Sequence, residues 1–226
     1  MKRLKYAVIL LLGLSMATMM TSCKKDGAHG YNGHDYVDLG LPSGTLWATC
    51  NVGADSPEGY GDLFAWGETV SKEVFKWSTY KYCNTIDGEH YLMTKYCTNS
   101  DYGYNGFVDN LTTLLPEDDA ATANWGNGWR TPTIDEWNEL FENTAHMWTI
   151  QNAVNGYLFV AENGNSLFMP AWEDDGDWGD YWSSSLYMGN SYCAYRPGFG
   201  IWGYETDEEY FSRKYEATIR PVYSNN

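Results

Sequence analysis

Glycine, proline, asparagine and aspartate divide the chain from His34 onward into short segments, and this punctuation restricts the fold more than any other feature. Segments of this kind form short strands joined by turns. Glu162-Asn163-Gly164-Asn165 predicts a hairpin, because Asn-Gly accepts the positive φ values that such turns need. The strand-like runs are 46–52, 62–66, 157–161, 166–169, 181–186, 191–196 and 216–223.

Two helices are predicted between these strands. The first spans 117–124 and has acidic residues in its first turn, where the helix dipole favours them. The second begins at Thr131-Pro132, and Thr133 with Glu136 forms a capping box. Apolar residues then share one face at helical spacing and are predicted to enter the core: Ile134, Trp137, Leu140 and Phe141.

The N-terminus has the pattern of a bacterial lipoprotein signal. Basic residues begin the chain, an apolar run follows at 7–14, and small residues precede Cys23. A plain cleaved signal peptide or an uncleaved membrane anchor are the competing interpretations, but the apolar run is shorter than the roughly 20 residues that span a bilayer. We therefore expect residues 1–22 to be removed and Cys23 to carry lipid, at the outer membrane or cell surface of a Gram-negative bacterium.

The rest of the chain is predicted to be a tether and one domain. Residues 23–33 are polar and glycine-rich, as in a flexible tether. No repeat period and no low-complexity linker divides residues 34–226, so we expect a single α+β domain with mostly antiparallel strands.

The charge of the chain restricts its partners. It has 30 acidic against 14 basic residues, a formal net charge of −16, and removal of the signal takes away basic residues only. Such a surface repels phosphate backbones, so no nucleic-acid partner is expected. It also disfavours anionic lipid, which leaves the lipid anchor as the predicted membrane contact.

Aromatic residues are the best candidates for ligand contact. The chain has 11 Trp, 19 Tyr and 8 Phe, more than burial alone accounts for. They are dense between Tyr187 and Phe211, where Ser, Gly and Asn separate them as in adaptable recognition loops. The opposing interpretation is a set of strands with alternate aromatics buried. The predicted ligand-binding residues are Trp178, Tyr187, Tyr192, Tyr195, Phe199, Trp202 and Tyr204.

An acidic segment is the candidate metal site. Residues 173–180 (EDDGDWGD) hold five carboxylates around two glycines, and oxygen atoms are the ligands that calcium prefers. A solvated acidic loop without metal is the opposing interpretation. The candidate calcium ligands are Glu173, Asp174, Asp175 and Asp177, and no other cofactor is expected.

Four cysteines remain besides Cys23, and they allow three pairings. Cys83 and Cys97 both follow a Lys-Tyr pair and flank a turn at Asp87-Gly88, so a disulfide between them is predicted first. Cys50 and Cys193 either form a second disulfide or are buried thiols.

Signatures of enzymes are absent from the sequence. It has no G-x-S-x-G, P-loop, H-E-x-x-H or dinucleotide fingerprint. Its four histidines are scattered, and none stands at ligand spacing from another histidine or a carboxylate. We therefore expect a protein that is not an enzyme.

A series of ordered motifs carries a family resemblance. They include 37–44 (VDLGLPSG), 46–54 (LWATCNVGA), 60–68 (YGDLFAWGE), 129–133 (WRTPT), 181–185 (YWSSS) and 219–222 (IRPV). Together these resemble the Fibrobacter succinogenes major paralogous domain family of exported bacterial proteins, over nearly all of residues 34–223. The resemblance implies a C-type-lectin-like fold, related in outline to formylglycine-generating enzymes, but no established reaction. Arg130 and Arg220 in these motifs are expected to bind buried acids or carbonyls.

These features together predict a non-enzymatic, lipid-anchored envelope or cell-surface domain that recognises a glycan or protein ligand through an aromatic-rich loop face. The rival prediction is a structural or adhesive envelope component, whose mark would be a broad apolar patch or an open edge strand. A formylglycine-generating-like enzyme is a third hypothesis, disfavoured because that chemistry needs reactive cysteines in the C-terminal part and only Cys193 lies there.

Overall fold

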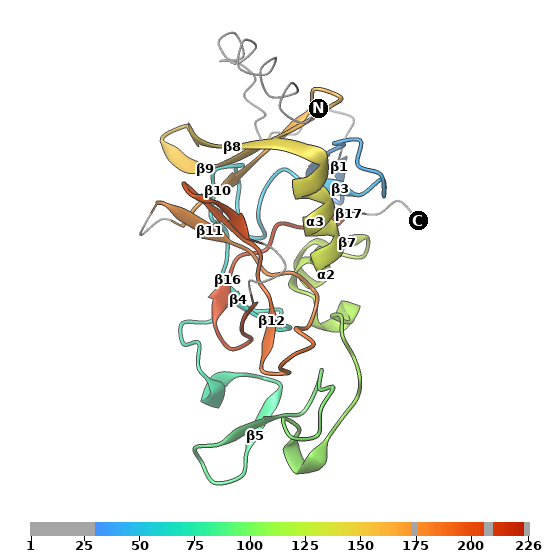
Figure 1. The fold of residues 1–226 in the computed structure, drawn as a ribbon, viewed down its shortest axis with the longest axis vertical. Coiled ribbons are helices and arrows are strands. Elements are labelled where there is room, and N and C mark those ends of the chain that lie inside the picture. Colours follow the sequence, from blue (N-terminus) through green and yellow to red (C-terminus); the bar gives the residue numbers. More distant parts are fainter. Residues whose placement is uncertain (1–29, 173–175, 206–209, 224–226) are drawn as a thin grey trace.

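A computed structural model describes residues 30–172, 176–205 and 210–223, which form a strand-rich fold with two α-helices (Figure 1). All strand pairs within these residues are antiparallel, as the sequence predicts. The largest sheet has the order β1-β2-β3-β17-β7. Its strands are β1 (Gly30–Tyr31), β2 (His34–Val37), β3 (Leu46–Ala48), β17 (Val222–Tyr223) and β7 (Trp129–Arg130).

A second sheet has the order β10-β9-β8. Its strands are β8 (Thr144–Gln151), β9 (Val154–Ala161) and β10 (Ser166–Pro170). The predicted hairpin around Gly164 is confirmed as β9–β10. The strand β8 was not predicted; it joins β9 through Asn152 and Ala153, whose φ values of 47° and 67° suit a two-residue hairpin turn.

The remaining strands are short. One sheet has the order β11-β13-β14, with β11 (Trp178–Asp180), β13 (Gly198–Gly200) and β14 (Gly203–Glu205). The two-stranded ribbons are β12 (Cys193–Tyr195) with β15 (Tyr210–Ser212), β16 (Glu216–Ala217) with β4 (Phe64–Ala65), and β5 (Cys83–Thr85) with β6 (Tyr91–Met93).

The predicted strand 181–186 is wrong, because this segment makes only isolated bridges. Its backbone N–H groups bond in turn to several distant segments, through the carbonyls of Pro197, Thr218, Tyr195, Pro132 and Thr112. A segment that crosses between so many neighbours satisfies its backbone without a regular ladder.

Helix α3 (Ile134–Asn143) confirms the second predicted helix and its capping box. Thr133 Oγ1 accepts from the Glu136 amide at 3.2 Å, and the Thr133 amide donates to the Glu136 carboxylate at 2.9 Å. The other α-helix, α2 (Ala120–Trp125), begins after the 3-10 helix η4 (Pro116–Asp118), and the remaining 3-10 helices are η2 (Trp77–Thr79) and η3 (Tyr104–Gly106). Within the described ranges no helix has the length and apolar character needed to cross a bilayer.

The core consists of two aromatic-rich clusters. The first is built around Trp66, Trp129 and Trp182. The second contains the buried face of α3, where Trp137 meets Trp47 edge-on at 4.9 Å between ring centroids. Trp137, Leu140 and Phe141 are buried and Ile134 is partly buried, as predicted.

Two arginines of the sequence motifs bind acceptors within the fold. Arg220 is fully buried and donates to the carbonyls of Ala48 and Thr49 and to Asn51 Oδ1, at 3.1, 2.7 and 2.7 Å. Arg130 donates to both carboxylate oxygens of Glu136. The expectation that these two arginines bind acids or carbonyls is confirmed.

The predicted Cys83–Cys97 disulfide is wrong, because both are free thiols. Cys83 lies opposite Met93, so backbone pairing of β5 with β6 closes the hairpin before Cys97 is reached. Cys97 is buried and is held to Asp109, whose Oδ1 accepts from its amide at 2.9 Å. Cys193 is free as well, so a Cys50–Cys193 disulfide is not formed. Cys23 and the tether up to residue 29 lie outside the described residues.

Candidate binding site

The predicted ligand-binding residues separate into two groups in space. Tyr187, Tyr192 and Tyr195 lie on or beside the β12–β15 ribbon. The others belong to the sheet of β11, β13 and β14: Trp178, Phe199, Trp202 and Tyr204.

Phe199 is wrong as a ligand contact. It is fully buried in the second core cluster, where its ring stacks with Tyr157 at 4.9 Å and with Tyr181 at 5.6 Å. The alternation of side chains along β13 explains this, because Phe199 points into the core between two glycines. Trp178 also serves packing: it lies over Gly198 and Gly200, where an added Cβ would come within 2.6 and 2.5 Å of its ring.

Trp202 is the most exposed of the predicted residues, with 91% of its surface accessible. It lies with Ile201 in the two-residue turn between β13 and β14. Tyr204 anchors this hairpin, since its ring stacks on Phe141 of α3 at 4.1 Å. Trp202 is therefore accessible, but it lies on a hairpin that does not line the hollow beside Tyr192, and its predicted ligand contact stays a prediction.

Tyr192 belongs to an open hollow of about 570 Å³, a volume typical of small-molecule sites. The hollow lies between the β5–β6 hairpin, the 3-10 helix η2 and the β12–β15 ribbon. Its aromatic lining is Trp77, Tyr91 and Tyr192, with Ile86 and Leu92 beside them. Its polar lining is Glu89, His90 and Ser212.

Specific contacts hold the aromatic walls of the hollow. The Tyr192 hydroxyl donates to the Tyr91 carbonyl at 2.8 Å, which joins the C-terminal segment to β6. The Tyr192 ring meets Trp77 edge-on at 5.4 Å, and the Cys83 thiol donates to the Trp77 carbonyl at 3.1 Å. These contacts hold the Tyr192 ring against the Trp77 ring and tie the backbones of Tyr91 and Trp77 to the walls of the hollow.

The polar rim belongs to a loop organised by Asp87. Its carboxylate accepts from the amides of Glu89 and His90 and pairs with the His90 ring. The amide bonds from His90 and Glu89, with the His90 side chain, lower the pKa of Asp87 to about 2. The Asp87 carboxylate is therefore ionised at neutral pH and caps the amides of the turn.

Three tyrosines continue the aromatic surface from the hollow. Tyr187 stacks on Tyr210 at 3.7 Å and meets Tyr195 edge-on at 5.5 Å. In the β12–β15 register Tyr195 lies opposite Tyr210, and Cys193 lies opposite Ser212. Residues two apart share a face, so this tyrosine group lies on the same side of the ribbon as Ser212, which lines the hollow.

The chemistry offered here is stacking and hydrogen bonding. The bond to Tyr210 raises the pKa of Tyr187, and burial raises that of Tyr192, so both hydroxyls stay protonated at neutral pH. Aromatic faces beside hydroxyl, imidazole and carboxylate groups suit a ligand with apolar faces and many hydroxyls.

The sequence missed Trp77 and Tyr91 as members of this surface, whereas Tyr210 lies within the aromatic-rich segment from Tyr187 to Phe211 that it indicated. The turn at Asp87-Gly88 was recognised, and its hairpin places Tyr91 beside the hollow. No sequence pattern indicated Trp77, because it is far from Tyr192 in the sequence and contacts it only in the folded chain.

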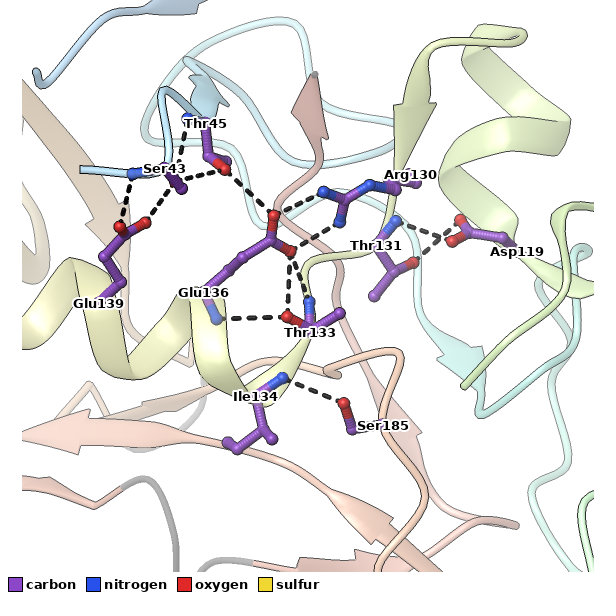
Figure 2. Close-up of polar contacts among 10 residues, drawn as sticks. All are labelled: Ser43, Thr45, Asp119, Arg130, Thr131, Thr133, Ile134, Glu136, Glu139 and Ser185. Carbon is purple, nitrogen blue, oxygen red and sulfur yellow. Dashed lines mark hydrogen bonds and ion pairs between the residues drawn. The ribbon is translucent and has the colours of Figure 1, made fainter. Parts of the chain in front are cut away.

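Other polar clusters are satisfied within the protein. In Figure 2 Glu136 binds Arg130, Thr45 and Thr133, while Asp119 accepts from the Thr131 amide and hydroxyl. These bonds join the start of α3 to neighbouring segments. We assign this cluster a structural role, since its carboxylates are bonded on both oxygens.

The predicted calcium site is described only in part. Asp177 is exposed, whereas Glu173, Asp174 and Asp175 lie outside the described residues. Within the residues that the structure covers, no group of three or more histidine, cysteine or acidic side chains is placed to hold a metal ion.

Comparison with protein-family models, with curated proteins and with solved structures finds no match to this chain.

Proposed function

We propose that this protein is a non-enzymatic recognition domain that binds a glycan in the aromatic hollow. Lipid on Cys23 holds it at the outer membrane or cell surface of a Gram-negative bacterium. The fold proposed for it is C-type-lectin-like, of the Fibrobacter succinogenes major paralogous domain family. The motifs of residues 34–223 support this family, and the signal-like N-terminus supports the location.

The observation that carries the proposal is the hollow lined by three aromatic residues, with a polar rim. Trp77, Tyr91 and Tyr192 present apolar surface to an opening of about 570 Å³, and Glu89, His90 and Ser212 stand beside it. Sugar rings have apolar C–H faces and hydroxyl edges, which match this alternation. The net charge of −16 disfavours strongly anionic ligands, so a neutral or cationic glycan is the favoured class.

A glycan-array screen of the purified protein tests the proposal, run once with calcium and once with a chelator. Saturable binding to a defined glycan supports it. Loss of that binding in chelator would assign a role to the acidic segment that includes Asp177. Silence on a folded sample rules out the glycan and leaves a protein ligand as the next candidate.

The rival proposal is a structural or adhesive envelope component. A specific observation favours it: β8 is an edge strand among the described residues, and Met147 and Ile150 on it are 45% and 66% exposed. Assembly and ligand binding use different surfaces, because Figure 1 shows β8 and β5 at opposite ends of the molecule. The two roles are therefore compatible.

A further inference from the structure

The strand β8 has one unpaired edge within the described residues. In the sheet order β10-β9-β8 it is the last strand, and Figure 1 shows it along the border of the sheet. Its partner β9 pairs with it over the whole length, from Thr144 opposite Ala161 to Gln151 opposite Val154. An edge of this length offers a row of backbone donors and acceptors to another strand.

The hydrogen bonds around β9 identify the residues of β8 whose backbone N–H and C=O groups point to the open edge. The Asn155 carbonyl accepts from the Ala171 amide at 2.8 Å, so Asn155 directs its backbone away from β8. Ile150 lies opposite Asn155, and its own N–H and C=O therefore point to the open edge. Hydrogen-bonded and non-hydrogen-bonded pairs alternate along an antiparallel ladder, so the backbone N–H and C=O groups of Thr144, His146 and Trp148 also point to the open edge.

The devices that usually protect an edge strand are missing from β8. Its residues, TAHMWTIQ, include no lysine, arginine, acid, proline or glycine, and its register with β9 has no bulge. Natural edges are commonly blocked by charges, prolines or bulges, because an open edge pairs with other chains. In a chain with 30 acidic residues, an uncharged strip of this length lets a second acidic molecule approach with less electrostatic repulsion than an acidic surface would.

We propose that β8 is a self-association interface, in which two copies of this chain pair their β8 strands antiparallel about a two-fold axis at Met147. Only in this register do all four residues with backbone groups at the open edge pair with one another. Thr144 then lies opposite Ile150 of the other copy, and His146 lies opposite Trp148. Such a contact is isologous and closes as a dimer.

The side chains of the sheet agree with this register. Phe168 lies opposite Leu158, and Leu158 lies opposite Met147, so an apolar row runs across the sheet to its open edge. About the two-fold axis Met147 meets Met147 of the other copy, and the row continues through Leu158 and Phe168 of that copy. The pairing covers the exposed side chains of Met147 and Ile150, and a single sheet then extends through both molecules.

Cysteine cross-linking of the full-length chain in a bacterial envelope tests the pairing and its register. With mild oxidant, Met147→Cys is expected to give a disulfide-linked dimer on a non-reducing gel, because the two sulfurs face each other across the axis. Thr149→Cys is expected to stay monomeric, since Thr149 lies opposite Ala145 of the other copy. The wild-type chain controls for its own thiols, including Cys83 and Cys193.

A backbone variant separates strand pairing from chance collision. In the Met147→Cys background, Ile150→Pro removes an N–H that makes no bond to β9, and we expect loss of the dimer. Ile150→Ala keeps that N–H and is expected to keep the dimer. The proposal is overturned if folded Met147→Cys stays monomeric, if Thr149→Cys cross-links as well as Met147→Cys, or if the dimer survives Ile150→Pro.

Discussion

The Tyr192 hydroxyl donates a hydrogen bond of 2.8 Å to the carbonyl oxygen of Tyr91, which lies 101 residues earlier in the chain. This bond joins the segment before β12 to the β5–β6 hairpin, and both residues line the hollow. The geometry of the proposed glycan site therefore depends on a contact between two distant parts of the sequence.

Removal of this bond tests how firmly the hollow is held. Tyr192→Phe leaves the Tyr91 carbonyl without its donor, so we expect the free energy of unfolding to fall by about 0.5–1.5 kcal/mol. Urea denaturation followed by tryptophan fluorescence measures the change. Tyr215→Phe is the matched control, since Tyr215 is 44% exposed, and its effect should stay within about 0.5 kcal/mol. Equal losses in both variants would show that the bond does not support the hollow.

The buried Arg213 guanidinium is expected to be a major source of stability. It donates to the Tyr80 hydroxyl and to the carbonyls of Tyr96, Ser191 and Lys95, at 2.9, 2.8, 3.0 and 3.1 Å. Arg213→Met leaves several buried acceptors unpaired, and a loss of about 3 kcal/mol or more is expected by thermal or chemical denaturation. Lys214→Met, one position later, is the control with an expected change within about 0.5 kcal/mol. Near-wild-type stability of Arg213→Met would contradict this role.

Asp118 gives stability a defined pH dependence. Burial raises the pKa of Asp118, but hydrogen bonds from Lys95, Tyr82 and Tyr96 outweigh burial and hold that pKa below its usual value of 3.8. The carboxylate therefore stabilises the fold above pH 3.8, and its contribution is lost as the pH falls through the lowered value.

Thermal unfolding of wild type and Asp118→Asn between pH 7 and pH 2 measures this contribution. The difference between their melting temperatures should be largest near neutrality and should shrink at the acidic end. A difference that stays constant over the whole range would rule out the ionised Asp118 as its source.

The thiol state of Cys83 and Cys97 provides an independent test of the fold. Burial raises the pKa of Cys83 to about 11, so its alkylation at pH 8 should be slow in the folded protein and fast after unfolding. Mass spectrometry of protein unfolded and alkylated without reductant should find Cys83, Cys97 and Cys193 modified. A peptide with Cys83 linked to Cys97 would contradict the structure.

Local signals in the sequence identified the elements whose cause is local. The capping box of Thr133 and Glu136, the apolar face of α3 and the Asn-Gly turn each act within a few residues, and all three are present. The strand β8 was missed because its residues show no clean alternation, and it is fixed by pairing with β9 over eight positions. The prediction of a Cys83–Cys97 disulfide was wrong for a related reason, since similar flanking residues do not determine the direction in which the Cys97 side chain points.

The candidate site could be predicted only in part for the same physical reason. Aromatic density indicated Tyr187, Tyr192 and Tyr195, but the same criterion chose Phe199, whose burial depends on packing against Tyr157. Sequence spacing does not reveal which side of a short strand faces the core when both sides carry aromatics. Trp77 joins the site only because the fold brings it to Tyr192.

The most direct test of the central claim compares two aromatic residues, Tyr91 and Trp202, for binding of the glycan found by the array. Tyr91 lines the hollow, whereas Trp202 lies on the separate β13–β14 hairpin. Isothermal titration of Tyr91→Ala should show binding weaker by about tenfold or more, as for a residue at the centre of an interface, while Trp202→Ala should bind like wild type. If Trp202→Ala abolishes binding and Tyr91→Ala retains it, the hollow is not the binding site.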